Sequence, residues 1–451
     1  MTADNQNTHL IAVIGAGPAG LYASRYLAGQ GLQVVLLNRD IKPGGLAEYG
    51  IYYDKYKMKE GLRKQFRQIL DDPNITYLGN VTIGQEGDLR LDDLRDMGFQ
   101  AILVAVGAQG TKWLGLPGEE LSGVYHAKDI VYHYNRLPPF STHEFTIGRR
   151  VALIGVGNVM LDIAHWVIRD LKVDDVVAVA RRGPAEVKFS KKEMEIVARN
   201  LDLDALDAEI DRVAPVMQAV GQDVQAARDF IFSALPKALE PVSHTRLRFE
   251  FLASPSRIVG NGDGWVCGLE VEDTTLIPKN GDTKARALGT KRVLDVDTVI
   301  FCIGDRVDES FGLPIQWNEY VKNPQPDYPV DGLSYEAFDL ETGKPVKGVF
   351  VAGWSREASS GLVGVARKDG ENGAKAVLQY LQDMPALDAV SRDRSVEKLI
   401  QKARASGKRV VDKMDVKKLV AVEQAEKERQ NLEDYKMKTN EEMLAVIAVQ
   451  D

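Results

Sequence analysis

The residue types and spacing best suited to chemistry in this chain lie in two glycine-rich turns, each between an apolar strand and a helix. The first turn, Gly15–Gly20, follows the strand Leu10–Ile14 and leads into a helix that extends to Gly29. Its first glycine permits a tight turn, its second lets backbone approach a pyrophosphate, and its third lets the helix pack on the strand. The amides at the helix N-terminus suit an anion. The pattern predicts a dinucleotide site formed by Gly15, Gly17, Pro18, Ala19 and Gly20.

The strand that follows, Gln33–Leu37, completes a βαβ unit but ends without the usual acid. Such a unit normally ends in a carboxylate for a ribose hydroxyl, whereas Asn38 stands here, followed by Arg39 and Asp40. An amide oxygen can still accept a hydrogen bond. We therefore expect a weaker ribose contact from Asn38 within the same fold.

The glycine pattern returns at Gly155–Met160, after the strand Arg150–Ile154 and before the helical segment Leu161–Asp170. Two mononucleotide folds in one chain imply two dinucleotides. Met160 replaces the third glycine, so we expect this helix to lie slightly farther from its strand; a turn without a ligand is the alternative. The residues expected to bind are Gly155, Gly157, Asn158 and Val159.

The next strand, Val176–Ala180, ends in two arginines, Arg181 and Arg182. An NAD-specific fold carries a carboxylate at this place, whereas paired guanidinium groups offer charged donors to a 2′-phosphate. The pair therefore favours NADPH over NADH. Two solvated surface arginines are the alternative.

Chain length and composition argue against several classes of function. The chain has 451 residues, enough for two domains, and a net charge of -8, which argues against general nucleic-acid binding. No apolar run approaches the roughly 20 residues that span a bilayer, and the first residues lack a secretory signal, so we expect a cytoplasmic protein. Two cysteines without C-x-x-C spacing and six scattered histidines predict no iron–sulfur cluster, redox disulfide or metal site.

In motifs spread along its length, the chain resembles adrenodoxin reductase and its bacterial ferredoxin-NADP reductase relatives. The pair Gly353-Trp354 after an apolar strand is the most specific of these motifs, because disulfide reductases typically carry Gly-Asp there. The matching segments are Gly15–Gly20, Gly45–Gly50, Gly79–Val81, Leu116–Leu121, Gly155–Asp162, Arg181–Pro184, Phe189–Glu193, and Gly353–Trp354 with Gly361.

The resemblance implies an α/β fold with two Rossmann-like three-layer domains, in which an inserted NADPH domain interrupts an FAD domain. We expect the FAD domain at 1–109 and 309–451, the latter with a helical C-terminal tail, and the NADPH domain at 110–308. The implied activity is that of a ferredoxin-NADP reductase. Hydride passes between NADPH and FAD, and single electrons pass to a ferredoxin-type iron–sulfur protein.

The resemblance also implies roles for individual residues. The Gly353-Trp354 backbone would lie beside the isoalloxazine and Gly361 would face the nicotinamide, although an ordinary turn glycine is the alternative for Gly361. Asp162 matches a carboxylate near both rings, and Arg181, Arg182 and Glu193 would hold the adenosine phosphate end of NADPH. The other expected cofactor contacts are Gly45, Leu46, Gly50, Val81, Gly107, Leu362 and Val363.

One departure from the family pattern is Lys55, which stands where the family has a histidine. An ammonium group can place charge near a flavin but cannot act as a neutral imidazole. Lys55 is therefore either a catalytic residue with a changed role or a surface residue in a loop that is rich in tyrosine.

Two segments could dock an electron acceptor. Lys57–Arg67 has five basic residues against one acid on a predicted helix, which suits an acidic ferredoxin, although a solvated helix face is the alternative. Arg392–Lys418 is basic and helical, and we expect solvated helices there rather than a docking arm or dimer contact. The segment Lys191–Leu239 is acidic and helical, unlike the basic surface of the mitochondrial relatives.

Two other functions remain open. One is an electron-transfer flavoprotein like the glutamate synthase small subunit, but only nine residues precede the first strand, where such chains carry a cluster domain. The other is a non-catalytic nucleotide sensor, for which Asn38, Lys55 and Met160 are the only support.

Overall fold

The computed structural model describes residues 7–358 and 361–448. The chain divides into two compact units. The first comprises Met1–Gly110, Tyr132–Thr142 and Asp305–Asp451, and the second comprises Thr111–Val131 and His143–Gly304. Tyr132–Thr142 therefore lies with the first unit, although the sequence analysis placed it in the inserted segment.

The first unit is built on a six-stranded sheet of order β17-β18-β4-β1-β2-β3. Its five strands from β18 to β3 are parallel, and β17 pairs antiparallel to β18 at the edge. The apolar residues of β1 are buried on both faces, as a central parallel strand requires. The strands are β1 (Leu10–Ile14), β2 (Gln33–Leu37), β3 (Ile75–Leu78), β4 (Ala101–Val104), β17 (Glu336–Asp339) and β18 (Lys344–Val351).

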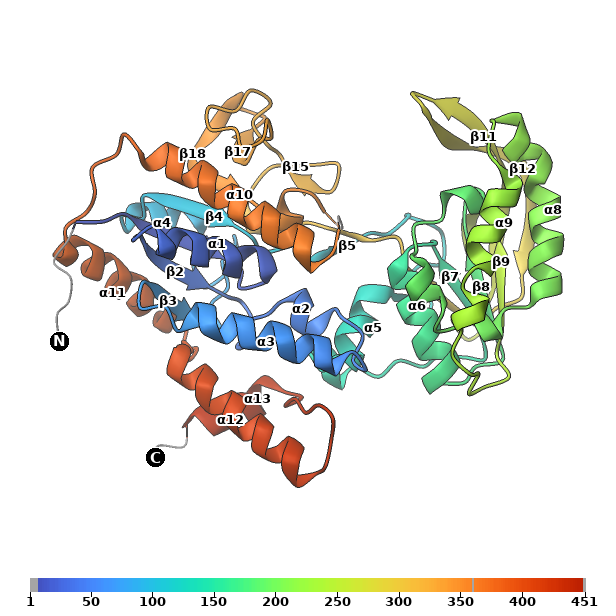
Figure 1. Cartoon of the computed structure of the whole chain (residues 1–451), viewed down its shortest axis with the longest axis horizontal. Helices are drawn as coiled ribbons and strands as arrows, with labels where there is room; N and C mark the ends of the chain where they lie inside the picture. The colour runs from blue at the N-terminus through green and yellow to red at the C-terminus, as the bar shows by residue number, and fades with distance from the viewer. Residues whose placement is uncertain (1–6, 359–360, 449–451) are drawn as a thin grey trace. The chain divides into compact units, whose positions relative to one another are not determined.

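Helices cover both faces of this sheet and give it three layers (Figure 1). On one face α1 (Pro18–Gly29) packs closely against α10 (Val363–Leu381), beside α3 (Tyr56–Leu70). A Cβ at Gly370 in α10 would lie 2.2 Å from the carbonyl oxygen of Ala19, so glycine there permits the close approach. The opposite face is covered by α4 (Leu91–Asp96) and α11 (Ala389–Ala405).

The C-terminal tail is part of this unit's core. After α11, Val411 pairs with Gly79 next to β3, and α12 (Lys413–Arg429) and α13 (Asn440–Ala448) follow. The helices were predicted, but our expectation that they are merely solvated is wrong. The two helices α12 and α13 and the segments that precede them bury apolar side chains in the core of the first unit: Val411, Val416, Leu419, Met437, Met443 and Ile447.

The second unit contains a five-stranded parallel sheet of order β6-β13-β7-β8-β9. Its strands are β6 (Val124–His126), β7 (Arg150–Ile154), β8 (Asp175–Val179), β9 (Arg246–Glu250) and β13 (Thr298–Phe301). Its helices are α6 (Asn158–His165), which continues as a π-helical turn over Trp166–Asp170, then α7 (Lys191–Met194), α8 (Leu203–Ala219) and α9 (Val224–Phe232). The α/β fold class predicted from the sequence is thus confirmed.

The sequence did not predict the second unit's antiparallel sheet of β10 (Ala253–Gly260), β11 (Val266–Lys279) and β12 (Asp282–Leu294). Shorter elements complete the two units. They are α2 (Leu46–Tyr49), α5 (Ala127–Tyr134), β5 (Gly110–Thr111), β14 (Asp305–Arg306), β15 (Ile315–Gln316) and β16 (Glu319–Tyr320), with short 3-10 turns.

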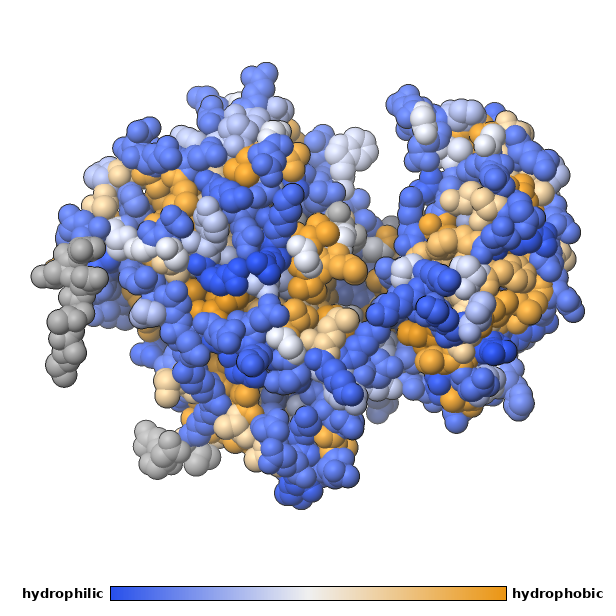
Figure 2. Space-filling model, viewed as in Figure 1, coloured by the Kyte–Doolittle hydropathy of each residue, from blue (hydrophilic) through white to orange (hydrophobic). Residues whose placement is uncertain are grey.

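Hydrophilic residues predominate on the face of the first unit that Figure 2 shows, and apolar residues appear there as separate patches. Within residues 7–358 and 361–448, no helix is both long and apolar enough to cross a membrane.

Candidate functional site

The first glycine turn has the geometry that a dinucleotide requires. Gly15 has a φ of +104°, and a Cβ at Gly20 would lie 1.9 Å from the Gly15 carbonyl oxygen, so both positions require glycine. At Gly17 the nearest atom to an added Cβ is the Cα of Gly45, at 4.0 Å. This open space leaves the backbone of the turn accessible to a pyrophosphate at the start of α1.

A second glycine pair lies against this turn. The amide of Gly44 donates to the Ala16 carbonyl at 2.8 Å, and Gly45, with a φ of +49°, would place a Cβ 2.9 Å from the Cα of Gly17. The short helix α2 then carries Leu46 and ends at Gly50. The structure therefore brings the predicted residues Gly45 and Leu46 to the first turn.

The side chain of Asn38, directly after β2, forms hydrogen bonds with backbone groups of the protein. Its amide oxygen, which we expected to accept a ribose bond, accepts one from the Ala16 amide at 3.0 Å. Its amide nitrogen donates to the carbonyls of Asp40 at 2.9 Å and Lys42 at 3.0 Å. The Asn38 carbonyl accepts from the amide of Val81 at 2.9 Å. Asn38 thus joins the first turn to the segments that follow β2 and β3.

The segments Gly107 and Gly353–Ser355 meet beside the same turn. The amide of Gly107, with a φ of +75°, donates to the Ser355 hydroxyl at 3.0 Å. A Cβ at Gly353 would lie 2.7 Å from the Cβ of Ala19 at the start of α1. Trp354, between them, is half-buried. Gly107, Gly353 and the start of α1 therefore lie close together.

Asp369 on α10 fixes this segment, and the sequence analysis missed it. Its carboxylate accepts from the Gly353 amide at 2.6 Å and pairs with the Arg356 guanidinium at 2.7 Å. The Tyr335 hydroxyl donates to it at 3.1 Å, and burial together with the Asp369 charge raises the pKa of Tyr335 to about 12. No local motif marks Asp369, because its partners precede it by 13 to 34 residues.

Gly361 has a conformational role of its own. Its φ is +72°, and an added Cβ would lie 2.6 Å from the Cβ of Val365. Leu362 follows as the exposed cap of α10, and Val363 is the first residue of that helix. The turn therefore requires glycine at 361 even before a nicotinamide is considered.

The second glycine turn repeats the first in the second unit. Gly155 has a φ of +117° and Gly157 is open, with nothing near an added Cβ. Asn158 accepts from the Ser190 amide at 2.7 Å through its side-chain oxygen, which ties the turn to the segment before α7. Val159 is exposed, and Met160, in place of the third glycine, is fully buried.

The two predicted phosphate ligands of this unit differ in their surroundings. Arg181 is exposed, and no carboxylate among the described residues forms an ion pair with it. Arg182 lies 3.5 Å from a carboxylate oxygen of Asp282 and 3.7 Å from one of Glu186. Glu193, on α7, is half-buried. Arg182 is therefore partly neutralised by acids that the sequence analysis did not consider.

Asp162 lies in the second unit and Lys55 in the first. Asp162 is half-buried on α6. Burial of the Cys302 thiol, together with the negative charge of Asp162, raises the pKa of Cys302. Lys55 is half-buried at the start of α3, and its amide donates to the Tyr52 carbonyl at 3.1 Å. The Tyr52 ring stacks on Tyr53 with centroids 4.8 Å apart.

The basic run on α3 offers less charge to a partner than its sequence indicates. Lys59 is 0% exposed and donates to the side chain of Asn135. Burial first, and then the Lys436 charge, lower the pKa of Lys59 to about 7. Arg63 pairs with Glu48 at 2.6 Å and with Asp434 at 2.8 Å. Two of the five basic side chains therefore point into the protein.

Comparison with known proteins shows what this chain is similar to. Residues 9–209 match the pyridine nucleotide-disulphide oxidoreductase family. The NADPH-ferredoxin reductase FprA of Mycobacterium leprae is 28% identical over 87% of this chain and 89% of its own. The mitochondrial NADPH:adrenodoxin oxidoreductase of Arabidopsis thaliana is 27% identical over 78% of each chain. The chain is homologous to these ferredoxin reductases.

The homology confirms the resemblance that the sequence motifs predict, and with it the assignment to the oxidoreductases. The structure of Mycobacterium tuberculosis FprA in complex with NADPH matches 98% of this chain and 100% of its own, with a TM-score of 0.79. At 24% identity, this likeness shows that the two chains share the same fold.

Proposed function

We propose that the protein is an FAD-dependent ferredoxin-NADP reductase, which transfers hydride between NADPH and FAD and single electrons to or from a ferredoxin-type iron–sulfur protein. The observation that carries the proposal is the presence of one open glycine turn in each unit, at the carboxyl end of a parallel sheet. The names of the homologous reductases support the same activity.

In this proposal the first unit, which comprises Met1–Gly110, Tyr132–Thr142 and Asp305–Asp451, binds FAD. The open backbone at Gly17 and the adjoining Gly45 form a cradle that a Cβ would fill, which fits a pyrophosphate. Gly107, Gly353 and Trp354 would lie beside the flavin ring, and Val81 beside the adenosine. The Asn38 side chain would support the site through Ala16 rather than by a ribose contact.

The second unit, which comprises Thr111–Val131 and His143–Gly304, would bind NADPH. Gly155, Gly157, Asn158 and Val159 would contact the pyrophosphate, and Arg181, with Arg182 and Glu193, the 2′-phosphate and ribose. Arg181 is suited to a phosphate because it is exposed and its guanidinium stays charged. Arg182 would contribute less to phosphate binding, since it already forms ion pairs with Asp282 and Glu186.

Bound FAD would supply the ability to accept a hydride and to release electrons singly. The chain's own part is to position the cofactors and exclude other groups. Gly361 keeps side-chain atoms away from the place where the nicotinamide would lie, with Leu362 and Val363 next to it. We assign Asp162 and Lys55 to the neighbourhood of the reacting rings, as a negative and a positive charge that would tune hydride transfer.

We place the electron acceptor in the ferredoxin class but not on α3 alone, because Lys59 and Arg63 are engaged inside the first unit. Steering of an acidic ferredoxin would depend on exposed basic groups, and its rate would fall with ionic strength.

The proposal is tested with the purified protein. It should be yellow, and under anaerobic conditions NADPH should bleach the flavin much faster than NADH does. Added ferredoxin should accelerate NADPH-dependent reduction of cytochrome c. A flavin that stays oxidised with NADPH would favour the nucleotide-sensing alternative. Bleaching without any effect of ferredoxin would point to another acceptor, as in a glutamate synthase-type subunit.

A further inference from the structure

The C-terminal segment Arg409–Met443 lies against the end of the first sheet where a dinucleotide would extend. Val411 exchanges two backbone hydrogen bonds with Gly79, at 2.8 and 3.0 Å, directly after β3. The side chain of Asn80 donates to the Arg409 carbonyl at 2.9 Å. This segment therefore lies at the β3 edge of the sheet, beside the carboxyl ends of β2 and β3.

Two buried ion pairs connect the segment to the loop Lys42–Gly50. Lys42 pairs with Glu423 of α12, and their side chains are 8% and 9% exposed. Lys436, before α13, pairs with Glu48 at 2.8 Å, with side chains 5% and 4% exposed. The two loop residues stand on either side of the glycine pair that packs on the first turn. A movement of the loop away from that turn would separate at least one of these buried pairs.

Glu48 is held from a second direction as well. The Arg63 guanidinium donates to its two oxygens at 2.6 and 2.7 Å and to Asp434 at 2.8 Å. Burial alone would raise the pKa of Glu48, but Lys436 and Arg63 lower it well below its ordinary value. The Lys436 ammonium also donates to the carbonyls of Glu48 at 2.9 Å and Asn135 at 3.2 Å. The charges of this network are thus closely compensated.

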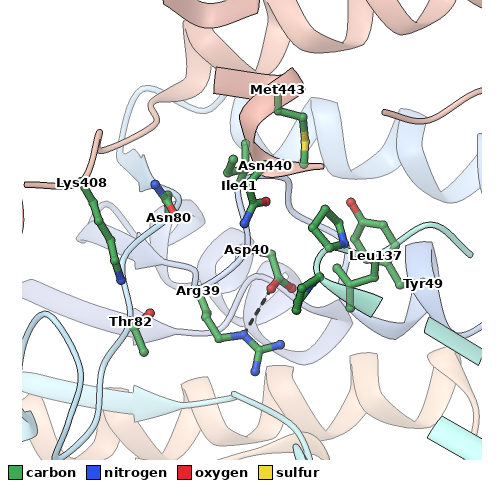
Figure 3. Close-up of a pocket in the computed structure, with 12 residues that line it drawn as sticks. Arg39, Asp40, Ile41, Tyr49, Asn80, Thr82, Leu137, Lys408, Asn440 and Met443 are labelled. Carbon is green, nitrogen blue, oxygen red and sulfur yellow. Dashed lines mark hydrogen bonds and ion pairs between the residues drawn. The ribbon is translucent and has the colours of Figure 1, made fainter. Parts of the chain in front are cut away.

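A cavity lies between the loop and the C-terminal segment (Figure 3). Its volume is about 240 Å³. Its lining combines residues that follow β2 and β3, Tyr49 and the segment Leu137–Pro139 with residues of the C-terminal segment and its approach. From the sheet come Arg39, Asp40, Asn80 and Thr82; from the other side come Lys408, Asn440 and Met443. In a Rossmann-like fold the ribose and base lie beyond the end of the second strand, so this is where the adenosine end of a dinucleotide extends.

We propose that the C-terminal segment Arg409–Met443 is part of the FAD site: it holds the loop Lys42–Gly50 against the first glycine turn and encloses the adenosine end of the cofactor. The inference rests on the proposed function, since it takes FAD to be the ligand of the first turn. Glu423 and Lys436 are then positioning residues, which act on the cofactor through Lys42 and Glu48.

The test compares two glutamates on one helix. Glu423→Gln removes the charge that compensates Lys42 but keeps an oxygen for the Met437 amide, which donates to Glu423 at 3.1 Å. Glu426→Gln is the matched control, because Glu426 pairs with Arg429 of its own helix. The FAD dissociation rate is followed on the holoprotein by the rise of flavin fluorescence after dilution, at a temperature where circular dichroism shows both variants folded.

We expect Glu423→Gln to release FAD on the order of tenfold faster than the parent, because breaking a buried ion pair leaves an uncompensated charge. Glu426→Gln should release it at the parent rate. Equal rates in all three proteins overturn the inference, even though the yellow colour of the parent would still support the proposed function. A parent that binds no flavin contradicts the proposed function itself.

A charge exchange provides a second test if Glu423→Gln does not fold. The double variant Lys42→Glu with Glu423→Lys restores an ion pair in the opposite sense, so FAD dissociation should return to within about threefold of the parent rate, given the usual spread of pair energies. A folded double variant that loses FAD as quickly as the Lys42→Glu single variant would contradict the proposed positioning role.

Discussion

The side-chain oxygen of Asn38 accepts a hydrogen bond from the backbone amide of Ala16 at 3.0 Å, which joins the end of β2 to the first glycine turn. An acid at this position would offer a carboxylate to a ribose, whereas Asn38 adds two donor bonds to the carbonyls of Asp40 and Lys42. The amide group suits this place because, unlike an ionised carboxylate, it can both accept from Ala16 and donate to carbonyls.

Replacement of Asn38 should therefore affect stability. We expect Asn38→Ala to lower the free energy of unfolding by about 1–3 kcal/mol, because the Ala16 amide and two carbonyls lose their partner in a buried place. Urea denaturation monitored by circular dichroism measures the change. A loss below about 0.5 kcal/mol would mean that the bonds are replaced by water.

Selectivity for NADPH should depend mainly on Arg181. Arg181→Ala should raise the KM for NADPH, with a loss in kcat/KM above about 1 kcal/mol, and spare NADH, because a charge-assisted contact to the 2′-phosphate is removed. Arg182→Ala should have the smaller effect, since Asp282 and Glu186 share that charge. Steady-state kinetics with both nucleotides decide this. Equal losses with NADPH and NADH for Arg181→Ala would argue against a phosphate contact.

The glycine at 361 can be tested against a neighbour. Gly361→Ala should slow anaerobic flavin reduction by NADPH, because a φ of +72° and a contact of 2.6 Å with Val365 oppose a side chain there. Gly364→Ala, where an added Cβ meets nothing within 4 Å, should leave the rate unchanged. Stopped-flow absorbance of the flavin gives both rates. If the two variants behave alike, the local conformation of Gly361 does not matter for the reaction.

Burial of Lys59 should make stability depend on pH. Its pKa is about 7 in the folded protein against 10.5 for an ordinary lysine, so the unfolded chain binds more protons between these values. Stability should therefore rise with pH from about 7 towards 10.5, and the full cost of the buried charge should be present below about 7. Melting temperatures of the parent and of Lys59→Met across this range measure it.

Lys59→Met is the control for the other groups that titrate in the same range. Its melting temperature should rise less with pH than that of the parent, because it lacks the buried ammonium. Parallel curves for the two proteins would show that Lys59 keeps an ordinary pKa.

The parts of the site that the sequence predicts are those determined by neighbours along the chain. Gly15 and Gly20 meet within one turn of helix, so their spacing alone indicates the strand, the turn and the helix. The paired arginines after β8 are likewise local. The alternation of Leu269 and Val271 in β11 was a usable signal for the antiparallel sheet, but β12 is largely exposed and carries no apolar pattern.

The sequence does not predict interactions of charged residues with partners that lie far away along the chain. In the sequence, Lys59 and Arg63 resemble part of a basic helix face. Only the fold shows that Lys59 donates a hydrogen bond to Asn135. It also shows that Arg63 forms ion pairs with Glu48 and Asp434. The C-terminal helices look solvated in the sequence for the same reason. The sequence does not show that Glu423 forms a buried ion pair with Lys42, or that Lys436 forms one with Glu48.

The pairing of Lys42 with Glu423 also has a consequence for the order of events during translation. The two residues are 381 positions apart, so at about 5–20 residues per second a ribosome needs roughly 20–80 seconds to supply the partner of Lys42. Throughout that interval the nascent chain has its first glycine turn but lacks the segment that secures the adjoining loop. With the role proposed for this segment, we expect stable capture of the flavin to be a late step, reached only when the last helices have left the exit tunnel.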